Sequence, residues 1–233
     1  MCFIAYDAPK KIFKWSSREI MVPRGQKRFV RRNLCVGILV GLFLAGCTGS
    51  GVQMVYLHFR PTGEMPSTQA TTVAIAPFQD MRSAPQIIGK RIRVDGSPET
   101  IMLGSPNTGK DITYIVTRYL EAKGVRVVDL PSWRPEPESL KDLPPGVRLA
   151  VTGRIENLDV QADSNLFRTV VRYRVRLTGY LGLPERGEVL TRSVEISPQK
   201  TTVTFDVRQV EEDLNGAIME AIGRLFEGVL SQI

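Results

Sequence analysis

Apolar and polar residues alternate along the chain with two periods, one typical of helices and one typical of strands. Between Thr108 and Lys123 the apolar residues recur every three or four positions, which predicts a helix that ends at Gly124. The same spacing runs from Val207 to Val229 and follows Asp206, a residue type that commonly caps helices. We therefore expect two amphipathic helices, the second near the C-terminus.

Shorter apolar or alternating runs, separated by turn residues, predict the strands. The expected strands are 73–78, a hairpin of 87–94 and 100–103, then 125–129, and a three-strand meander of 147–160, 167–181 and 187–196. Five prolines between Pro131 and Pro145 predict a surface loop. The element order favours an α+β fold, a two-layer domain with a mixed, mostly antiparallel sheet and two amphipathic helices on one face.

The N-terminal part of the chain has the pattern of a secretory leader. A basic stretch from Arg24 to Arg32 precedes thirteen uncharged, mostly apolar residues, 34–46. A helix that spans a bilayer needs about 20 such residues, so this run is too short to be a stable span. A basic segment followed by a short apolar segment that ends in small residues predicts a signal peptide over 21–46.

The end of the apolar run, Leu44-Ala45-Gly46-Cys47, resembles the lipobox of bacterial lipoproteins. The resemblance implies that Leu44, Ala45 and Gly46 are recognised by the signal peptidase, which cuts before Cys47. It also implies that Cys47 carries the acyl chains, typically palmitate, that hold the protein on a membrane lipid layer. Thr48 follows the cysteine instead of the Asp that retains enteric lipoproteins in the inner membrane. We therefore expect an outer-membrane location facing the periplasm.

These features divide the chain into four parts. Residues 1–20 precede a methionine, Met21, that would itself start a normal signal peptide, so we interpret them as a mis-annotated extension. Residues 21–46 are the signal peptide, and 47–71 form a lipidated tether whose apolar patch, 52–59, could supply one edge strand. Residues 72–233 form the periplasm-facing α+β domain.

The leader also changes the charge and the cysteine count. The chain has 31 Lys and Arg against 24 Asp and Glu, but residues 1–46 hold nine of these bases and two of these acids. The remaining 22 bases and 22 acids cancel, which argues against nucleic acid as a partner. Of the three cysteines only Cys47 lies in the mature part, so we expect no disulfide. With one histidine, the sequence offers no metal site and calls for no cofactor.

One expected strand carries four arginines on one face: Arg168, Arg172, Arg174 and Arg176. They could form a strip that binds an anionic ligand, such as a lipid headgroup or a glycan. The alternative, favoured by the zero net charge, is a solvated sheet face whose arginines pair with carboxylates on adjoining strands, such as Glu156, Asp159, Glu188 or Glu195.

Two further motifs have a chemical and a structural interpretation. The segment from Gly104 to Lys110 matches the phosphate-loop spacing, but Asp111 follows where that loop needs a Ser or Thr. We therefore expect no nucleotide and favour a turn in which Asn107 or Thr108 caps the next helix. Asp80 and Arg82 could form a small site, but a local ion pair is the favoured interpretation.

Taken with the lipobox, the element order resembles that of the YajG-like bacterial lipoproteins. The likeness rests on the strand that leads to Asp80-Met81-Arg82 and Ile88-Gly89, and on the helix that ends Leu120-Glu-Ala-Lys-Gly124 before a Val-rich strand. It implies a periplasm-facing domain that is anchored to the outer membrane and has no known catalytic activity. Our leading hypothesis is a non-enzymatic envelope lipoprotein that binds a protein partner or assists envelope assembly. The alternative is an accessory lipoprotein of a lipid or lipopolysaccharide transport system, which would need an apolar cleft.

Overall fold

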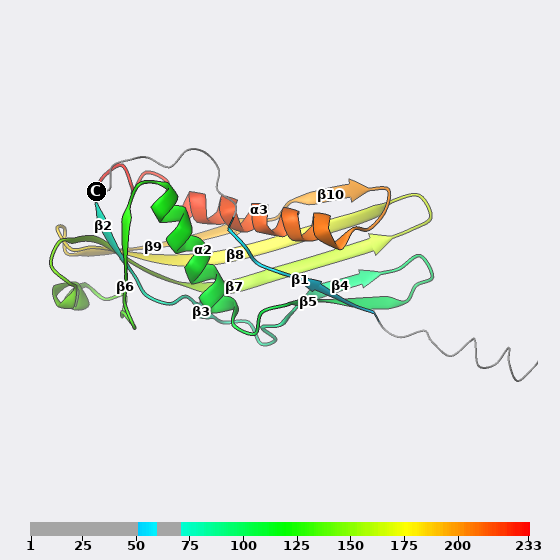
Figure 1. Cartoon of the computed structure of the whole chain (residues 1–233), viewed down its shortest axis with the longest axis horizontal. Helices are drawn as coiled ribbons and strands as arrows, with labels where there is room; N and C mark the ends of the chain where they lie inside the picture. The colour runs from blue at the N-terminus through cyan, green and yellow to red at the C-terminus, as the bar shows by residue number, and fades with distance from the viewer. Residues whose placement is uncertain (1–50, 60–70) are drawn as a thin grey trace, which may run out of the picture. The chain divides into compact units, whose positions relative to one another are not determined.

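The computed structural model describes residues 51–59 and 71–233 (Figure 1). The elements, in chain order, are β1 (Val52–Val55), β2 (Thr72–Ile75), β3 (Gln79–Asp80), β4 (Ile87–Ile92), β5 (Pro98–Leu103), α2 (Thr108–Ala122), β6 (Arg126–Asp129), the 3-10 helix η1 (Pro137–Asp142), β7 (Val147–Ser164), β8 (Thr169–Leu183), β9 (Glu188–Ile196), β10 (Gln199–Thr202) and α3 (Val207–Phe226).

The long strand β7 organises the sheet. On one side it pairs with β2, β3 and β4 in succession along its length, and on the other side it pairs with β8. From β2 the sheet continues to β6, and from β4 it continues through β5 to β1. Beyond β8 lie β9 and the short β10, side by side with different parts of that strand. One strand of 18 residues therefore joins two branches of a single sheet.

Both helices lie against the same face of the sheet (Figure 1). Asn107 caps α2 by accepting a hydrogen bond from the backbone N–H of Lys110, and Asp206 caps α3 in the same way through Arg208. The helices also contact each other, since the rings of Tyr119 and Phe226 stack with centroids 5.9 Å apart. The apolar stripes of both helices and the covered face of the sheet share one hydrophobic core.

On the opposite face of the sheet the described residues place only η1, whose Leu140 lies against Gly182 of β8, and neither α-helix packs there; the rest of this face is uncovered. Paired residues of neighbouring strands project from the same face, so the register identifies the residues of this uncovered face. One row runs from Val52 through Thr100, Lys90 and Gln161 to Arg172. Buried side chains alternate with these residues along β7 and β8 and point to the helices.

The α+β class and the mixed sheet are confirmed, and the expectation of a mostly antiparallel sheet is met only in part. Five strand pairs are parallel and four are antiparallel among the described residues. The reason is that β2, β3 and β4 all run in the direction of β7, and the crossover through α2 places β6 parallel to β2. The sheet also curls, so a flat two-layer description fits only in part.

The predicted hairpin, meander and two helices are present, with bounds shifted by a few residues. The apolar patch after Cys47 does supply an edge strand, β1, which pairs parallel with β5. The strand β10 was not predicted, because Gln199-Lys-Thr-Thr202 is short and polar. The division of the chain at residues 20, 46 and 71 stays a prediction.

Candidate functional site

The lipidation motif, Leu44 to Cys47, lies outside the described residues, so acylation of Cys47 stays a prediction. The description starts at Gly51, which is already part of the sheet because its carbonyl accepts a hydrogen bond from the backbone N–H of Thr100, 3.1 Å away. Only three residues therefore separate the predicted acylated cysteine from the folded body.

Three of the four arginines on β8 and its preceding turn are held by carboxylates. Arg172 contacts Asp163 at 2.6 Å, and both Arg174 and Arg176 contact Glu195 on β9. The hydrogen bond from Arg176 to Glu195 lowers the pKa of the glutamate and raises the pKa of the arginine. Glu195 was among the expected partners, whereas Asp163 was not.

Arg168 differs from the other three arginines. It lies in the turn between β7 and β8 and is exposed, and it has no carboxylate partner among residues 51–59 and 71–233. Three arginines that already face a carboxylate offer little net attraction for an anion. Binding of an anionic ligand along the strip stays untested, and the geometry favours the solvated, ion-paired sheet face.

Asp80 and Arg82 form the expected ion pair. Nε and Nη2 of Arg82 donate to the two carboxylate oxygens at 2.9 and 2.7 Å, and the two side chains are only 8% and 12% exposed. Partial burial acts to raise the pKa of Asp80, but the hydrogen bonds from Arg82 outweigh it and hold the pKa below its usual value. Nη2 also donates to the carbonyl of Pro85 and the hydroxyl of Thr108, so the arginine ties β3 to the start of α2.

The segment from Gly104 to Lys110 forms the turn before α2. The side chain of Asn107 accepts from the backbone N–H of Lys110 at 2.9 Å, which is the cap expected from the sequence. Asp111 occupies the first turn of the helix, where a carboxylate interacts favourably with the helix dipole and would repel a phosphate.

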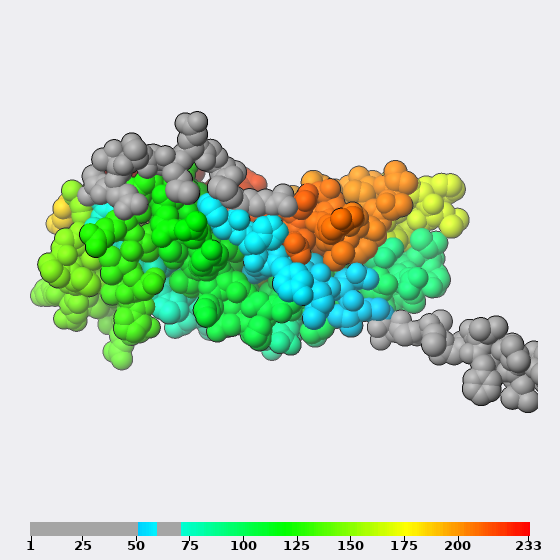
Figure 2. All heavy atoms as spheres, viewed as in Figure 1, coloured from blue at the N-terminus to red at the C-terminus, as the bar shows by residue number. Residues whose placement is uncertain are grey.

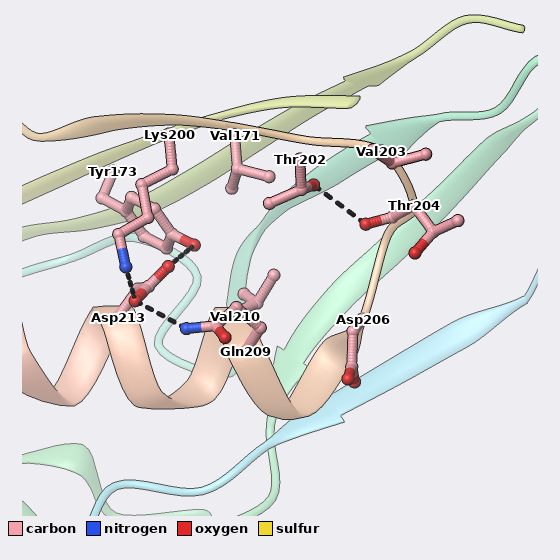
Figure 3. A pocket seen from close by; sticks show the side chains of 10 residues that line it. All are labelled: Val171, Tyr173, Lys200, Thr202, Val203, Thr204, Asp206, Gln209, Val210 and Asp213. Carbon is pink, nitrogen blue, oxygen red and sulfur yellow. Dashed lines mark hydrogen bonds and ion pairs between the residues drawn. The ribbon is translucent and has the colours of Figure 1, made fainter. Parts of the chain in front are cut away.

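A small pocket of about 210 Å³ lies between β8, β10 and the start of α3 (Figure 3). Tyr173, Lys200 and Gln209 converge there on the carboxylate of Asp213, which accepts a hydrogen bond from each of them. Burial, followed by the charge and hydrogen bond of Asp213, raises the pKa of Tyr173, so its hydroxyl stays a donor. The carboxylate is occupied by these protein donors, and the arrangement fastens β10 to α3.

A larger cleft of about 640 Å³ lies at the carboxyl ends of the parallel strands β2 and β6, beside α2. Ligands of α/β sheets commonly bind at this position, and the volume is within the range of small-molecule sites. The strands contribute Ile75, Pro77, Phe78, Asp129 and Leu130, and the helix contributes Asn107, Lys110, Thr113, Tyr114 and Thr117. The lining is mixed, with a cation and an anion beside an apolar floor.

The uncovered face of the sheet carries an exposed apolar row that the sequence did not reveal. Met54, Met102 and Ile87 are paired across β1, β5 and β4. Met54 and Ile87 are 48% and 50% exposed, and Val52 beside them is 53% exposed. We call Val52, Met54, Ile87 and Met102 the β1–β5 apolar face.

This face continues into a hollow of about 430 Å³ whose other walls include Pro85 and Pro106. The segment 51–59 lies at the surface (Figure 2). Its apolar alternation at 52, 54 and 56 was the available signal in the sequence, but the partners on β4 and β5 lie more than thirty residues away.

Within the part of the chain that the structure describes, no helix is long and apolar enough to cross a membrane. Nor do the same residues contain a group of three or more His, Cys, Asp and Glu side chains that could hold a metal ion.

No family model matches the chain, and no curated protein matches it in sequence. Several solved structures align with it at low identity. A Xanthomonas campestris protein of family DUF330 aligns at 10% identity and a TM-score of 0.49, over 77% of this chain and 96% of that one. Lipoprotein GNA1162 from Neisseria meningitidis aligns at 11% identity and a TM-score of 0.35, over 66% of this chain and 99% of that one. A Helicobacter pylori protein, described as a homologue of neuraminyllactose-binding hemagglutinin, aligns at 12% identity and a TM-score of 0.42, over 73% and 88% of the two chains. The resemblance to YajG-like lipoproteins stays a prediction.

Proposed function

We propose that this protein is a non-enzymatic lipoprotein of the bacterial envelope that binds another envelope protein. Cys47 carries the acyl chains, and the body binds the partner through the β1–β5 apolar face. The leader and the lipobox support the anchor, and Thr48 after the cysteine supports an outer-membrane location facing the periplasm. Two or more acyl chains suffice for stable anchoring without a membrane span.

The exposed apolar row carries the partner-binding part of this proposal. Contiguous apolar patches on the surface of a soluble protein often mark a site that binds another protein or a ligand. Here Met54, Met102 and Ile87 are adjacent across three strands, and methionine side chains adapt readily to the shape of a partner. The charged part of the same sheet face, on β8 and β9, is already ion-paired and offers less to a partner.

Site-specific photo-cross-linking in intact cells tests this proposal. A photoreactive amino acid at Met54 should give an adduct with one envelope protein, identified by mass spectrometry. The matched control position is Thr191, which is also exposed but lies on β9 at the other edge of the sheet. The adduct should disappear when Met102→Asp places a charge in the apolar row. The proposal fails if Met54 gives no protein adduct, or if Met102→Asp leaves the adduct unchanged.

The cleft beside α2 supports a second candidate function, that of an accessory lipoprotein in lipid or lipopolysaccharide transport. Its floor of Ile75, Phe78 and Leu130 could hold an apolar chain, and Lys110 at the rim could contact an anionic headgroup. Mass spectrometry of lipids extracted from the purified protein tests this function. A lipid that co-purifies with the native protein, and is lost when Thr117→Trp fills the cleft, would favour transport over partner binding.

A further inference from the structure

Three loops at one end of the sheet expose large apolar side chains. The turn between β7 and β8 carries Leu166 and Phe167, which are 79% and 83% exposed. The turn between β4 and β5 carries Val94, 52% exposed, and the loop after β10 carries Val203, 79% exposed. We call Val94, Leu166, Phe167 and Val203 the apolar tip.

The strand pairing places these loops together. Ile92, the last residue of β4, pairs with Asp163 near the end of β7, so the two turns that follow them are neighbours. Thr202, the last residue of β10, pairs with Thr169 at the start of β8, directly after the β7–β8 turn. Figure 1 shows the three loops at the same end of the sheet. The exposed apolar residues therefore lie in neighbouring loops at one end of the sheet, although more than 100 residues of sequence separate the first from the last.

The first residue of β1, Val52, is at the end of that strand that faces the apolar tip. β7 and β4 run toward the apolar tip, and β5 and β1 run away from it. The strand β1 therefore begins at its tip-facing end and runs away from the tip. In register, Val52 lies level with Gln161 of β7, through Thr100 and Lys90.

The segment from Gln161 to Leu166 and the segment from Cys47 to Val52 have the same length. Leu166 is five residues beyond Gln161, and Cys47 is five residues before Val52. At about 3.3 Å per residue, each stretch spans about 17 Å when extended. An extended chain can thus bring the predicted acylated cysteine level with Leu166 and Phe167.

We propose that the apolar tip inserts into the surface of the lipid bilayer to which Cys47 is anchored. This inference rests on the proposed lipid anchor. The acyl chains hold the tip at the membrane, and insertion of Leu166 and Phe167 fixes how the body stands on it. The exposed Arg168 lies beside these residues, where a guanidinium can contact lipid phosphates while its stem follows the apolar surface. From this inserted turn the strands β7 and β8 extend away from the bilayer. The β8–β9 turn, at the other end of β8, is then far from the membrane.

Depth-dependent fluorescence quenching tests the inserted tip. A single cysteine is introduced by Phe167→Cys, or by Arg186→Cys in the exposed β8–β9 turn as the matched control. The two turns are separated by the 15 residues of β8, about 46 Å of extended strand. Each lipidated protein is labelled with an environment-sensitive dye and reconstituted into vesicles of phosphatidylethanolamine and phosphatidylglycerol. Nitroxide lipids in these vesicles quench dyes that reach the bilayer.

We expect the nitroxide lipids to quench the emission at position 167 and to leave the emission at position 186 unchanged, as for a side chain in the lipid interface and one in water. Flotation of the vesicles reports the anchor separately. Protein that floats with the vesicles but shows no quenching at position 167, or equal quenching at both positions, overturns the inserted tip and leaves the lipid anchor standing. Lipidated protein that does not float contradicts the anchor, and the inserted tip with it.

Discussion

The substitution Asp80→Asn changes only a few atoms, but it should strongly destabilise the folded body. Asparagine keeps the shape of the side chain, but it removes the charge that faces Arg82. The two side chains are 12% and 8% exposed, so water cannot replace the lost carboxylate. The arginine would keep the carbonyl of Pro85 and the hydroxyl of Thr108 as acceptors, and its charge would stay buried and uncompensated.

The expected magnitude follows from this burial. Breaking a buried ion pair by removing one charge typically costs about 3 kcal/mol. For a body of the size of Ser50–Ile233, each kcal/mol lowers the melting temperature by roughly 2–4 °C, which gives a decrease of about 6–12 °C. The matched control is Glu220→Gln, which breaks the exposed pair of Glu220 and Arg224 on α3. That change should cost less than about 0.5 kcal/mol.

Urea unfolding followed by circular dichroism measures both variants. The account predicts a clearly lower midpoint for Asp80→Asn and an almost unchanged midpoint for Glu220→Gln. If the free energy of unfolding of Asp80→Asn is within about 0.5 kcal/mol of that of the native protein, the pair does not hold β3 against α2 in the way described.

The same pair predicts a dependence on pH. The pKa of Asp80 is lower in the folded protein than its ordinary value of about 3.9 in an unfolded chain. Its contribution to stability is therefore present above about pH 4 and is lost as the pH falls through the folded pKa. The difference in unfolding free energy between the native protein and Asp80→Asn should shrink at acid pH. A difference that stays constant down to pH 2 would contradict the ionised pair.

Three further variants test the packing and the charged face. Gly153→Ala would place a methyl group 2.2 Å from the ring of Phe78 and 2.7 Å from the carbonyl of Thr178, so we expect a loss of about 2 kcal/mol in urea unfolding. Leu214→Ala on α3 removes a side chain with no exposed surface and should lower the free energy of unfolding by about 2–5 kcal/mol in the same assay. The control Arg208→Ala changes an exposed side chain and should leave the free energy of unfolding unchanged. The double charge reversal of Arg172 and Arg174 to Glu should leave binding to phosphatidylglycerol vesicles unchanged, because the native arginines already face carboxylates. Weakened vesicle binding would restore the anionic-ligand interpretation of the strip.

The sequence predicted the elements better than their arrangement. Helical spacing, the caps Asn107 and Asp206, and the alternation in the meander are local signals, and each led to the right element. The parallel pairing of β2, β3 and β4 with β7 depends on contacts between distant segments, which no local pattern encodes. For this reason the sequence could not identify which strands pair in parallel.

For the candidate sites too, the sequence predicted features formed by neighbouring residues and missed those formed by distant segments. The ion pair of Asp80 and Arg82 was predicted because its partners are two residues apart in the sequence. The β1–β5 apolar face and the apolar tip could not be predicted, since each gathers apolar residues from strands or turns that are distant in the sequence. Phe167 was expected to start a strand, and only the register showed that the loops of Val94 and Val203 lie near it.

The central claim is that Cys47 is acylated and holds the folded body on a membrane. The most direct test compares the native chain with Cys47→Ser in intact cells, by membrane fractionation and by the mass of the processed protein. The account predicts that the native protein sediments with membranes and carries the mass of acyl chains on residue 47. It predicts that Cys47→Ser is neither acylated nor cut before residue 47. A Cys47→Ser protein that keeps the native processed size and still sediments with membranes in the same proportion would contradict the account.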